Sequence, residues 1–289
     1  MSRAGGGRWV VARALLLASL AAACDASGSI LAQEVAARRL SADLRVQFSK
    51  AADASNRAVM ADTDEASIAA AREAEAALTA AGDAAKSLDP VLRQLGHADE
   101  IGLLDSFNRK FAEYRTLDMN ILGLAVENTN LKAQRLSFGD AREAADSFRG
   151  ALDAIVRAAP ATDALAARSV LAVREIQVLQ ARHIAEPDDA AMTQLEAEMS
   201  ADAAAAGKNL DELSRKAPPA AKPSLAEARA ALDRFMSVHA EILRLSRRNS
   251  NVRSLALSLG QKRTVTAECD DLLQALQDAV AKHEFRATR

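Results

Sequence analysis

A stripe of apolar residues runs through positions 104–139 at steps of three and four. Its first members are Leu104, Phe107, Phe111, Tyr114, Leu117, Ile121 and Leu124. This spacing puts every member on one face of an α-helix, so it predicts one long amphipathic helix. A second stripe with the same spacing runs through positions 225–260. We therefore expect two long helices, each with one face directed at a core.

The two stretches are copies of one sequence, offset by 121 residues. Between residues 121–139 and 242–260, 8 of 19 positions are identical. Each copy interrupts its apolar stripe with an asparagine, Asn128 in the first and Asn249 in the second. The chain is therefore predicted to contain a duplicated helical unit.

The whole pattern predicts about eight helices, which end at turn residues and prolines. They cover residues 31–60, 65–88, 98–138, 140–158, 162–184, 189–213, 224–259 and 260–284. All six prolines fall between these elements, as expected because an interior proline costs a helix about 3 kcal/mol. No strand-like alternation occurs.

These elements predict an all-α fold of two tandem up-and-down four-helix bundles, at residues 25–158 and 160–285, without β-structure. The apolar register also continues across Pro160. One long kinked helix joining the two bundles is therefore an open alternative to a clean break at that proline.

The first 24 residues resemble an export signal. Arg3, Arg8 and Arg13 precede a ten-residue apolar run at 14–23, which is shorter than the roughly 20 residues that span a bilayer. Small residues then lead into Cys24, as in a bacterial lipobox, although the usual leucine three residues earlier is missing. We predict an exported, periplasmic protein anchored through lipidated Cys24. Ordinary cleavage, which would leave a soluble exported protein, is the alternative.

Composition excludes several classes of function. Hydrophobic residues make up 49% of the chain and aromatic residues 3%, which favours close-packed helices. The net charge is −2 and no basic run with aromatics occurs, so no nucleic-acid partner is expected. If Cys24 is acylated, the only other cysteine, Cys269, forms no disulfide, and its acidic neighbours predict an inert thiol.

No catalytic, metal-binding or cofactor motif is found. The four histidines, at positions 97, 183, 239 and 283, are scattered along the sequence, and no Glu-x-x-His pair occurs. Neither a haem-attachment motif nor a glycine-rich phosphate loop is present. We therefore expect a protein that is not an enzyme and that holds no cofactor or metal.

Part of the chain resembles the four-helix-bundle sensor domain of bacterial methyl-accepting chemotaxis proteins. The resemblance rests on Phe111 and Tyr114, on Ala133 and Leu136, and on Gly139 at the turn into the next helix. It covers about residues 31–156 and, more weakly, the second repeat. It implies an extracytoplasmic sensor-like bundle. It does not extend to the family's second membrane span, coupling module or cytoplasmic coiled coil.

Four residues are candidate ligand contacts. Asn128 and Asn249 lie on the stripe, where buried asparagine either fixes helix register or faces a small polar pocket of the kind that the resemblance implies. Arg135 extends the stripe of the first copy. It either pairs with an anionic ligand, or extends its charged end to the surface or to a neighbouring carboxylate. Tyr114 is either a core residue whose hydroxyl reaches an edge or a ligand contact.

The sequence thus predicts a non-catalytic sensor-like lipoprotein in chemosensory-type signalling. A small organic or amino-acid ligand, a membrane receptor and a second copy of the chain, forming a homodimer, are the partners that it allows. The alternative is a structural or adaptor lipoprotein without a small-molecule ligand.

Overall fold

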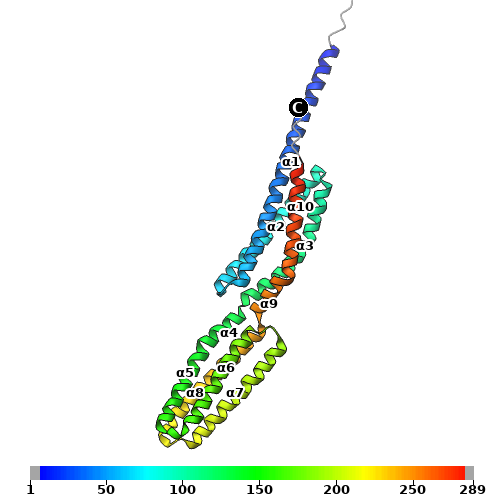
Figure 1. The fold of residues 1–289 in the computed structure, drawn as a ribbon. Helices are drawn as coiled ribbons and strands as arrows, with labels where there is room; N and C mark the ends of the chain where they lie inside the picture. The colour runs from blue at the N-terminus through cyan, green and yellow to red at the C-terminus, as the bar shows by residue number, and fades with distance from the viewer. Residues whose placement is uncertain (1–6, 284–289) are drawn as a thin grey trace, which may run out of the picture. The chain divides into compact units, whose positions relative to one another are not determined.

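The structure is a computed structural model that describes residues 7–283, with side chains from residue 30 onward (Figure 1). Within this range it contains helices and no strand, so the all-α prediction is confirmed. None of the described helices is both long enough and apolar enough to cross a bilayer. Cys24 and the predicted export signal lie outside the residues whose side chains are described.

The helices follow the predicted order but differ at several ends. They are α1 (Gly7–Met60), α2 (Asp64–Leu95), α3 (Ala98–Glu127), α4 (Thr129–Phe138), α5 (Asp140–Ala158), α6 (Asp163–Ala185), α7 (Asp189–Lys216), α8 (Lys222–Arg248), α9 (Ser250–Leu257) and α10 (Arg263–Lys282). Short 3₁₀ turns precede α6 and α8, and a π-helical segment, Ser258–Lys262, precedes α10. Each predicted long helix is therefore divided in two, at Asn128 and at Asn249.

Prolines do not all lie between helices. Helix α2 continues through Pro90 to Leu95, beyond the predicted end at residue 88. Pro90 is exposed, so no core packing is disturbed there. At Pro160, by contrast, the chain leaves the helical conformation at Ala159 (φ −148°) and forms a 3₁₀ turn. Helices α5 and α6 are consequently separate, and the alternative of one kinked helix is wrong.

The described chain forms two compact units. Unit 1 contains residues up to Arg57, Ala69–Met119 and the segment from Leu259 onward. Unit 2 contains Ala58–Ile68 and Asn120–Ser258. The predicted division near residue 159 is therefore wrong, because the helices on both sides of Pro160 belong to unit 2.

Each unit takes helices from both sequence repeats. The core of unit 1 is formed by α1, α2, α3 and α10, and the core of unit 2 by α5, α6, α7 and α8 with a contribution from α4. The offset of 121 residues makes α5 the counterpart of α10. The last helix of each repeat thus completes the unit built on the other repeat, because its apolar face packs there. For α5 that partner is mainly α8.

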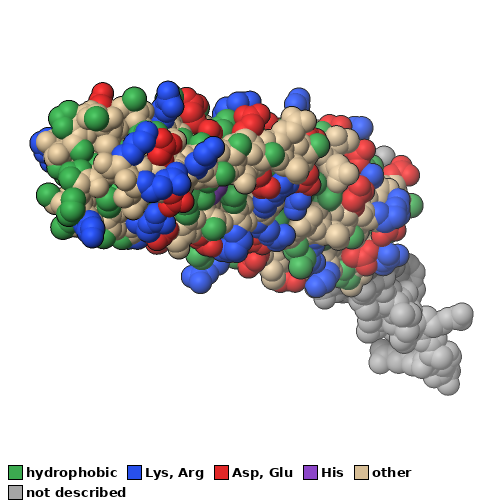
Figure 2. All heavy atoms as spheres, turned by 90° about the horizontal axis from the view of Figure 1, so that it is seen from below, with side chains coloured by type: hydrophobic (Ala, Val, Ile, Leu, Met, Phe, Trp, Pro, Cys, Tyr) green, Lys and Arg blue, Asp and Glu red, His purple; other side chains and the backbone are tan. Residues whose placement is uncertain are grey.

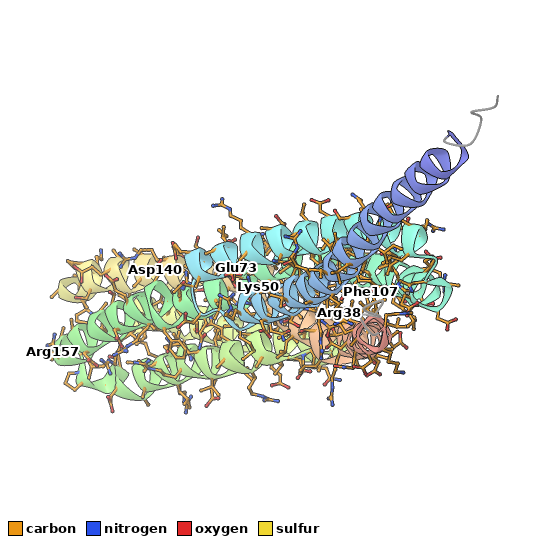
Figure 3. All side chains as sticks on the ribbon, turned by 90° about the horizontal axis from the view of Figure 1, so that it is seen from above. Arg38, Lys50, Glu73, Phe107, Asp140 and Arg157 are labelled. Atoms are coloured by element: carbon orange, nitrogen blue, oxygen red, sulfur yellow. The ribbon has the colours of Figure 1, made fainter. Side chains whose placement is uncertain are left out.

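Four aromatic residues pack together in the core of unit 1. Phe48 of α1 meets Phe107, Phe111 and Tyr114 of α3 edge to face, with ring centroids 5.0–6.1 Å apart. Phe107, labelled in Figure 3, is fully buried. The first apolar stripe therefore faces a core, as predicted. On the face shown in Figure 2, acidic and basic side chains are interspersed, in keeping with the small net charge.

Candidate functional site

Asn128 and Asn249 interrupt the two long helices within unit 2. Both adopt the left-handed helical conformation, with φ of 50° and 52°. Asparagine tolerates this conformation better than most residues other than glycine. Both residues are buried, as predicted, but they are helix breaks rather than interior helix positions.

The residues after each break hydrogen-bond to one another reciprocally. The backbone amide of Thr129 donates to Ser250 Oγ at 3.1 Å, and the amide of Ser250 donates to Thr129 Oγ1 at 3.0 Å. The amides of Asn130 and Asn251 each donate to the other's Oδ1 at 3.1 Å. Each side chain thus satisfies an amide at the start of the equivalent helix, where intrahelical acceptors are missing.

The asparagine side chains complete this arrangement, which we name the asparagine crossing (residues 127–130 and 248–251). Asn130 Nδ2 donates to Asn249 Oδ1 at 2.7 Å, and Asn251 Nδ2 donates to Asn128 Oδ1 at 2.9 Å. Asn249 Nδ2 also donates to the carbonyl of Glu186 at 2.8 Å, whereas Asn128 Nδ2 is buried without a partner. These contacts favour a structural role for both predicted residues, and a ligand contact at Asn128 stays a prediction.

The crossing is flanked by an ion pair between equivalent positions of the two repeats. Arg248 donates to both carboxylate oxygens of Glu127, at 2.6 and 2.5 Å. This hydrogen bonding and the arginine charge, which outweigh partial burial, lower the pKa of Glu127. The pair is half-exposed, so it adds orientation more than stability.

Arg135 does not join the asparagines. Its guanidinium is exposed, where Nη2 donates to the carbonyl of Asp62 at 3.3 Å and Nη1 lies 3.9 Å from Asp64. This position is exposed because α4 begins anew after Asn128, which agrees with the alternative in which Arg135 reaches the surface. Asp64 is thus the neighbouring carboxylate of the predicted alternative. Recognition of an anionic ligand by Arg135 stays a prediction.

Tyr114 belongs to unit 1 and is fully buried; its hydroxyl makes no hydrogen bond of ordinary geometry, although the Asp118 carboxylate is close enough to act on it. Burial, reinforced by the charge of Asp118, raises its pKa well above the usual value. The residue is therefore neutral, and no edge of the bundle is within its reach.

Beside Tyr114 lies a charged cluster that the sequence analysis missed. Lys262 Nζ is 2.9 Å from Asp118 Oδ1, and Ser55 Oγ donates to the same oxygen at 2.5 Å. Lys262 also contacts Ser55 directly, and both ionic side chains are at most 2% exposed. Asp118 Oδ2 has no partner. The missed signal was a carboxylate at a stripe position, four residues after Tyr114 and three before Ile121.

Unit 2 holds a polar group at the equivalent position. His239, the counterpart of Asp118, is buried, and its Nδ1 accepts a hydrogen bond from Gln180 Nε2 at 2.9 Å. Gln180 Oε1 accepts in turn from Ser137 Oγ at 3.1 Å. Burial, with the nearby His183 as a smaller cause, lowers the pKa of His239 to about 4, so the imidazole is neutral near pH 7.

A second histidine in unit 2 resembles part of a hydrolase triad in composition only. His183 Nδ1 lies 2.8 Å from Ser246 Oγ and its Nε2 lies 2.9 Å from Glu196, which Arg247 also holds. Ser246 and His183 are fully buried, so no substrate carbonyl reaches the hydroxyl. Burial lowers the pKa of His183, against the opposing effect of Glu196. The arrangement anchors the end of α6 to α7 and α8.

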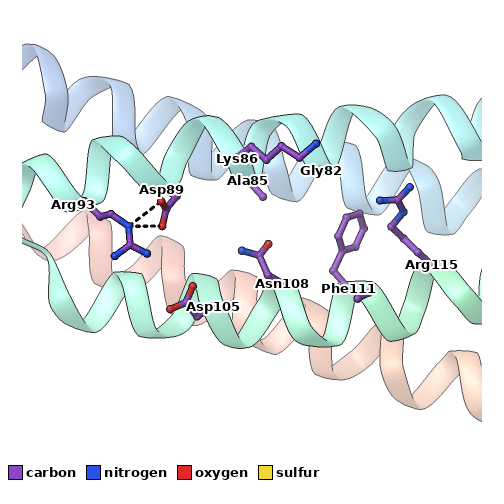
Figure 4. Close-up of a pocket in the computed structure, with 10 residues that line it drawn as sticks. Gly82, Ala85, Lys86, Asp89, Arg93, Asp105, Asn108, Phe111 and Arg115 are labelled. Carbon is purple, nitrogen blue, oxygen red and sulfur yellow. Dashed lines mark hydrogen bonds and ion pairs between the residues drawn. The ribbon is translucent and has the colours of Figure 1, made fainter.

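Unit 1 carries two open grooves with charged walls. One, of about 530 Å³, lies between α2 and α3, where Arg93 pairs with Asp89 opposite Asp105 and Asn108 (Figure 4). The other, of about 580 Å³, lies between α3 and α10. Leu117, Gln261 and Val265 help to line it, and Leu117 and Gln261 directly precede Asp118 and Lys262 in the chain.

The structure also brings together two histidines that are far apart in the sequence. The rings of His97 and His283 have centroids 3.7 Å apart in unit 1. With Glu34 they offer three potential metal-ligand atoms that lie within 4.8 Å of one another. These histidines are scattered in the sequence, and only the packing of α10 against α1 and α3 makes them neighbours.

Cys269 is buried in the core of unit 1. Burial, together with the charges of Asp270 and Glu268, raises the pKa of its thiol to about 12. The protonated thiol is therefore the stable form, which agrees with the expectation of an inert cysteine.

Comparison with known proteins finds no family model that matches this chain and no similar curated protein.

Proposed function

We propose that this chain is a non-catalytic, exported, sensor-like protein and that unit 1 binds a small organic or amino-acid ligand in its core. The observation that carries the proposal is the buried pair of Asp118 and Lys262, beside which Asp118 Oδ2 and the Tyr114 hydroxyl make no hydrogen bond of ordinary geometry. In helical bundles, ligand sites are built from side chains on facing helices, as these are.

The energetics support a ligand at this place. A buried ion pair recovers its desolvation cost only when its remaining hydrogen-bonding capacity is satisfied. Each buried polar atom without a partner costs about 1–3 kcal/mol. A ligand that hydrogen-bonds to Asp118 Oδ2 and to the Tyr114 hydroxyl would recover part of that cost. Binding would therefore be driven by polar atoms that the folded protein leaves without a good hydrogen bond.

The charges of the cluster match an amino acid. The Lys262 ammonium would bind the ligand carboxylate, and the Asp118 carboxylate would bind the ligand ammonium, so both charges of a zwitterion are met. The groove between α3 and α10, which Leu117, Gln261 and Val265 help to line, would be the route of access. In this proposal each unit serves as an up-and-down four-helix bundle, as in the sensor domains that the sequence resembles.

A thermal-shift screen with amino acids and organic acids tests this proposal. A ligand present at 100 times its Kd should add about 2.7 kcal/mol to the free energy of unfolding. We expect a saturable rise in Tm for the wild type that is lost in Lys262→Met and Asp118→Asn. His239→Gln, which changes the equivalent position in unit 2, is the matched control and should retain the full shift.

Two outcomes would contradict the proposal. One is the absence of a shift with every compound tested. The other is a shift that survives in both Lys262→Met and Asp118→Asn, which would place the ligand elsewhere.

The proposed cellular role is chemosensory-type signalling through a membrane receptor, with the protein attached to the membrane by Cys24. The export segment and the resemblance to chemoreceptor sensor domains support it. Cell fractionation tests the attachment. The wild type should sediment with membranes and Cys24→Ser should be released, whereas a wild type already free in the periplasm would refute the anchor.

Exposed apolar side chains favour a second candidate, an adaptor lipoprotein without a small-molecule ligand. Leu171 and Val178 lie two turns apart on α6 and are 59% and 58% exposed. Phe138, at the end of α4, is 64% exposed. Such residues suit a protein partner or a second copy of the chain. Failure of the ligand screen, together with co-purification of a receptor that Val178→Asp abolishes, would favour this candidate.

A further inference from the structure

Four side chains from separate parts of the chain converge at one end of unit 1. Glu34 comes from α1, His97 from the α2–α3 connection, Glu100 from the first turn of α3, and His283 from the residue after α10. His97 Nε2 lies 2.9 Å from Glu34 Oε1, and His283 Nε2 lies 2.8 Å from Glu100 Oε1. The start of α3 and the end of α10 meet the middle part of α1 here (Figure 1).

The backbone holds His97 in place. Gly96 adopts φ of 73° after the end of α2, which allows the amide of His97 to donate to Leu92 and that of Gly96 to donate to Arg93, at 3.1 and 3.2 Å. This is the Schellman arrangement of a helix end. The carbonyl of His97 then accepts a hydrogen bond from the amide of Ile101, in the first turn of α3. The imidazole of His97 is thus carried by a short connection that is hydrogen-bonded to the end of α2 and to the start of α3.

The other histidine is positioned by α1. Arg38, labelled in Figure 3, donates from Nη2 to the carbonyl of His283. Glu100 is 4% exposed and bonds the imidazole from α3. His283 therefore has a defined position although it follows the last turn of α10.

The set of donor atoms matches a divalent transition metal. Imidazole nitrogen and carboxylate oxygen bind Zn²⁺ at about 2.0–2.2 Å, so ligands around one ion stand a little over 3 Å apart. The three atoms from Glu34, His97 and His283 lie within 4.8 Å of one another. A modest movement of these side chains would therefore bring the three atoms to the spacing of ligands around one ion. Glu34 Oε2 is buried without a partner, which leaves a carboxylate oxygen for a cation.

We propose that Glu34, His97 and His283 form a binding site for a divalent transition metal such as Zn²⁺. Glu100 completes the coordination or orients His283, as carboxylates beside metal-bound histidines do. His283 is 37% exposed, so the ion is open to solvent on that side. The metal would join α10, which completes unit 1 from the second repeat, to α1 and to the α2–α3 connection. This proposal is independent of the ligand proposed for the core.

Zinc titration of the full-length protein against a chromophoric chelator tests the site. We expect one Zn²⁺ per chain with a Kd of micromolar or below, and a rise in Tm when zinc is added. His97→Gln and His283→Gln should each weaken binding by at least tenfold. His239→Gln, which removes a histidine from unit 2, is the matched control and should bind zinc like the wild type.

Folding of each variant is checked by circular dichroism without metal. Glu34→Gln, which keeps the size of the side chain and removes its charge, provides a second route if a histidine variant does not fold, and it should also bind at least tenfold more weakly. The proposal is overturned if the wild type binds no zinc at 100 times the protein concentration used. It is also overturned if the folded variants bind zinc as tightly as the wild type.

Discussion

Asp118 and His239 show how single buried polar residues are accommodated in this protein. They occupy equivalent positions of the two repeats, and each is buried against a partner from another helix. Asp118 is held by Lys262 and Ser55, and His239 by Gln180. A charge buried in unit 1 therefore needs an opposite charge, whereas the imidazole in unit 2 remains neutral and needs one hydrogen-bond donor.

The neutral His239 predicts a loss of stability in acid. Its pKa in the folded state is about 4, mainly through burial, against about 6.5 in an unfolded chain. The unfolded state therefore binds the proton more readily, and the contribution to stability is present above pH 6.5 and is lost as the pH falls toward 4. The full loss is about 3 kcal/mol.

Urea unfolding of wild type and His239→Gln at pH 7, 5.5 and 4 checks this expectation. The free energy of unfolding should fall more steeply with decreasing pH in the wild type than in the variant, which keeps a hydrogen-bonding side chain but does not titrate. Equal slopes for the two proteins would show that His239 is not the titrating group.

At the scale of helices, the two asparagines divide each predicted long helix into two shorter ones. Each long stripe continues in sequence past Asn128 or Asn249, but a left-handed residue ends the helix and starts a new one. A second break follows at Gly139 and Gly260, which share non-helical angles. A Cβ atom at Gly139 would stand 2.9 Å from the carbonyl oxygen of Arg135, so the turn requires glycine there.

Substitution at the crossing should separate backbone conformation from hydrogen bonding. Asn128→Ala forces an ordinary L-residue into the left-handed region, at about 1–2 kcal/mol. It also leaves Asn251 Nδ2 without its acceptor, at about 1–3 kcal/mol. Asn128→Gly removes only the hydrogen bond, so it should destabilise unit 2 by about 1–2 kcal/mol less than alanine does.

Denaturant unfolding of both variants, and of the same pair at Asn249, measures these differences. Asn249→Ala should be the more damaging alanine, because Asn249 bonds both Asn130 and the carbonyl of Glu186. If alanine and glycine prove equally destabilising, the left-handed conformation is not what selects asparagine.

For the whole molecule, the exchange of the last helix between repeats makes the two halves of the chain interdependent. Helix α10 places Val265, Cys269, Leu273, Leu276 and Val280 in the core of unit 1. Burial of such side chains contributes about 1.5–3 kcal/mol each, so their sum, about 10 kcal/mol, rivals the net stability of a typical domain.

Residues 25–158 alone should therefore lack a cooperative unfolding transition, because α5 is adapted to unit 2 and α10 is missing. Mixing this fragment with residues 159–289 should restore helicity and a cooperative transition, as measured by circular dichroism during heating. A fragment of residues 25–158 that unfolds cooperatively with the Tm of the whole chain would show instead that each repeat closes its own bundle.

The sequence by itself determined that the chain is helical and which face of the first long helix is buried before Asn128. Steps of three and four put Phe107, Phe111 and Tyr114 on one face, and they are buried, because helical periodicity is a local property. The duplication was also evident from the sequence, because Asn128 and Gly139 recur as Asn249 and Gly260 at an offset of 121 residues. These features depend only on residues close in the chain or on the comparison of one segment with another.

Only the tertiary structure decided which helices share a core and which polar residues meet. Helices α5 and α10 are repeats of each other, so their similar apolar faces do not predict which unit each helix packs into. The left-handed backbone at Asn128 and Asn249 is likewise not revealed by periodicity. Lys262 meets Asp118, and His97 meets His283, because long-range packing joins segments whose sequence separation carries no signal.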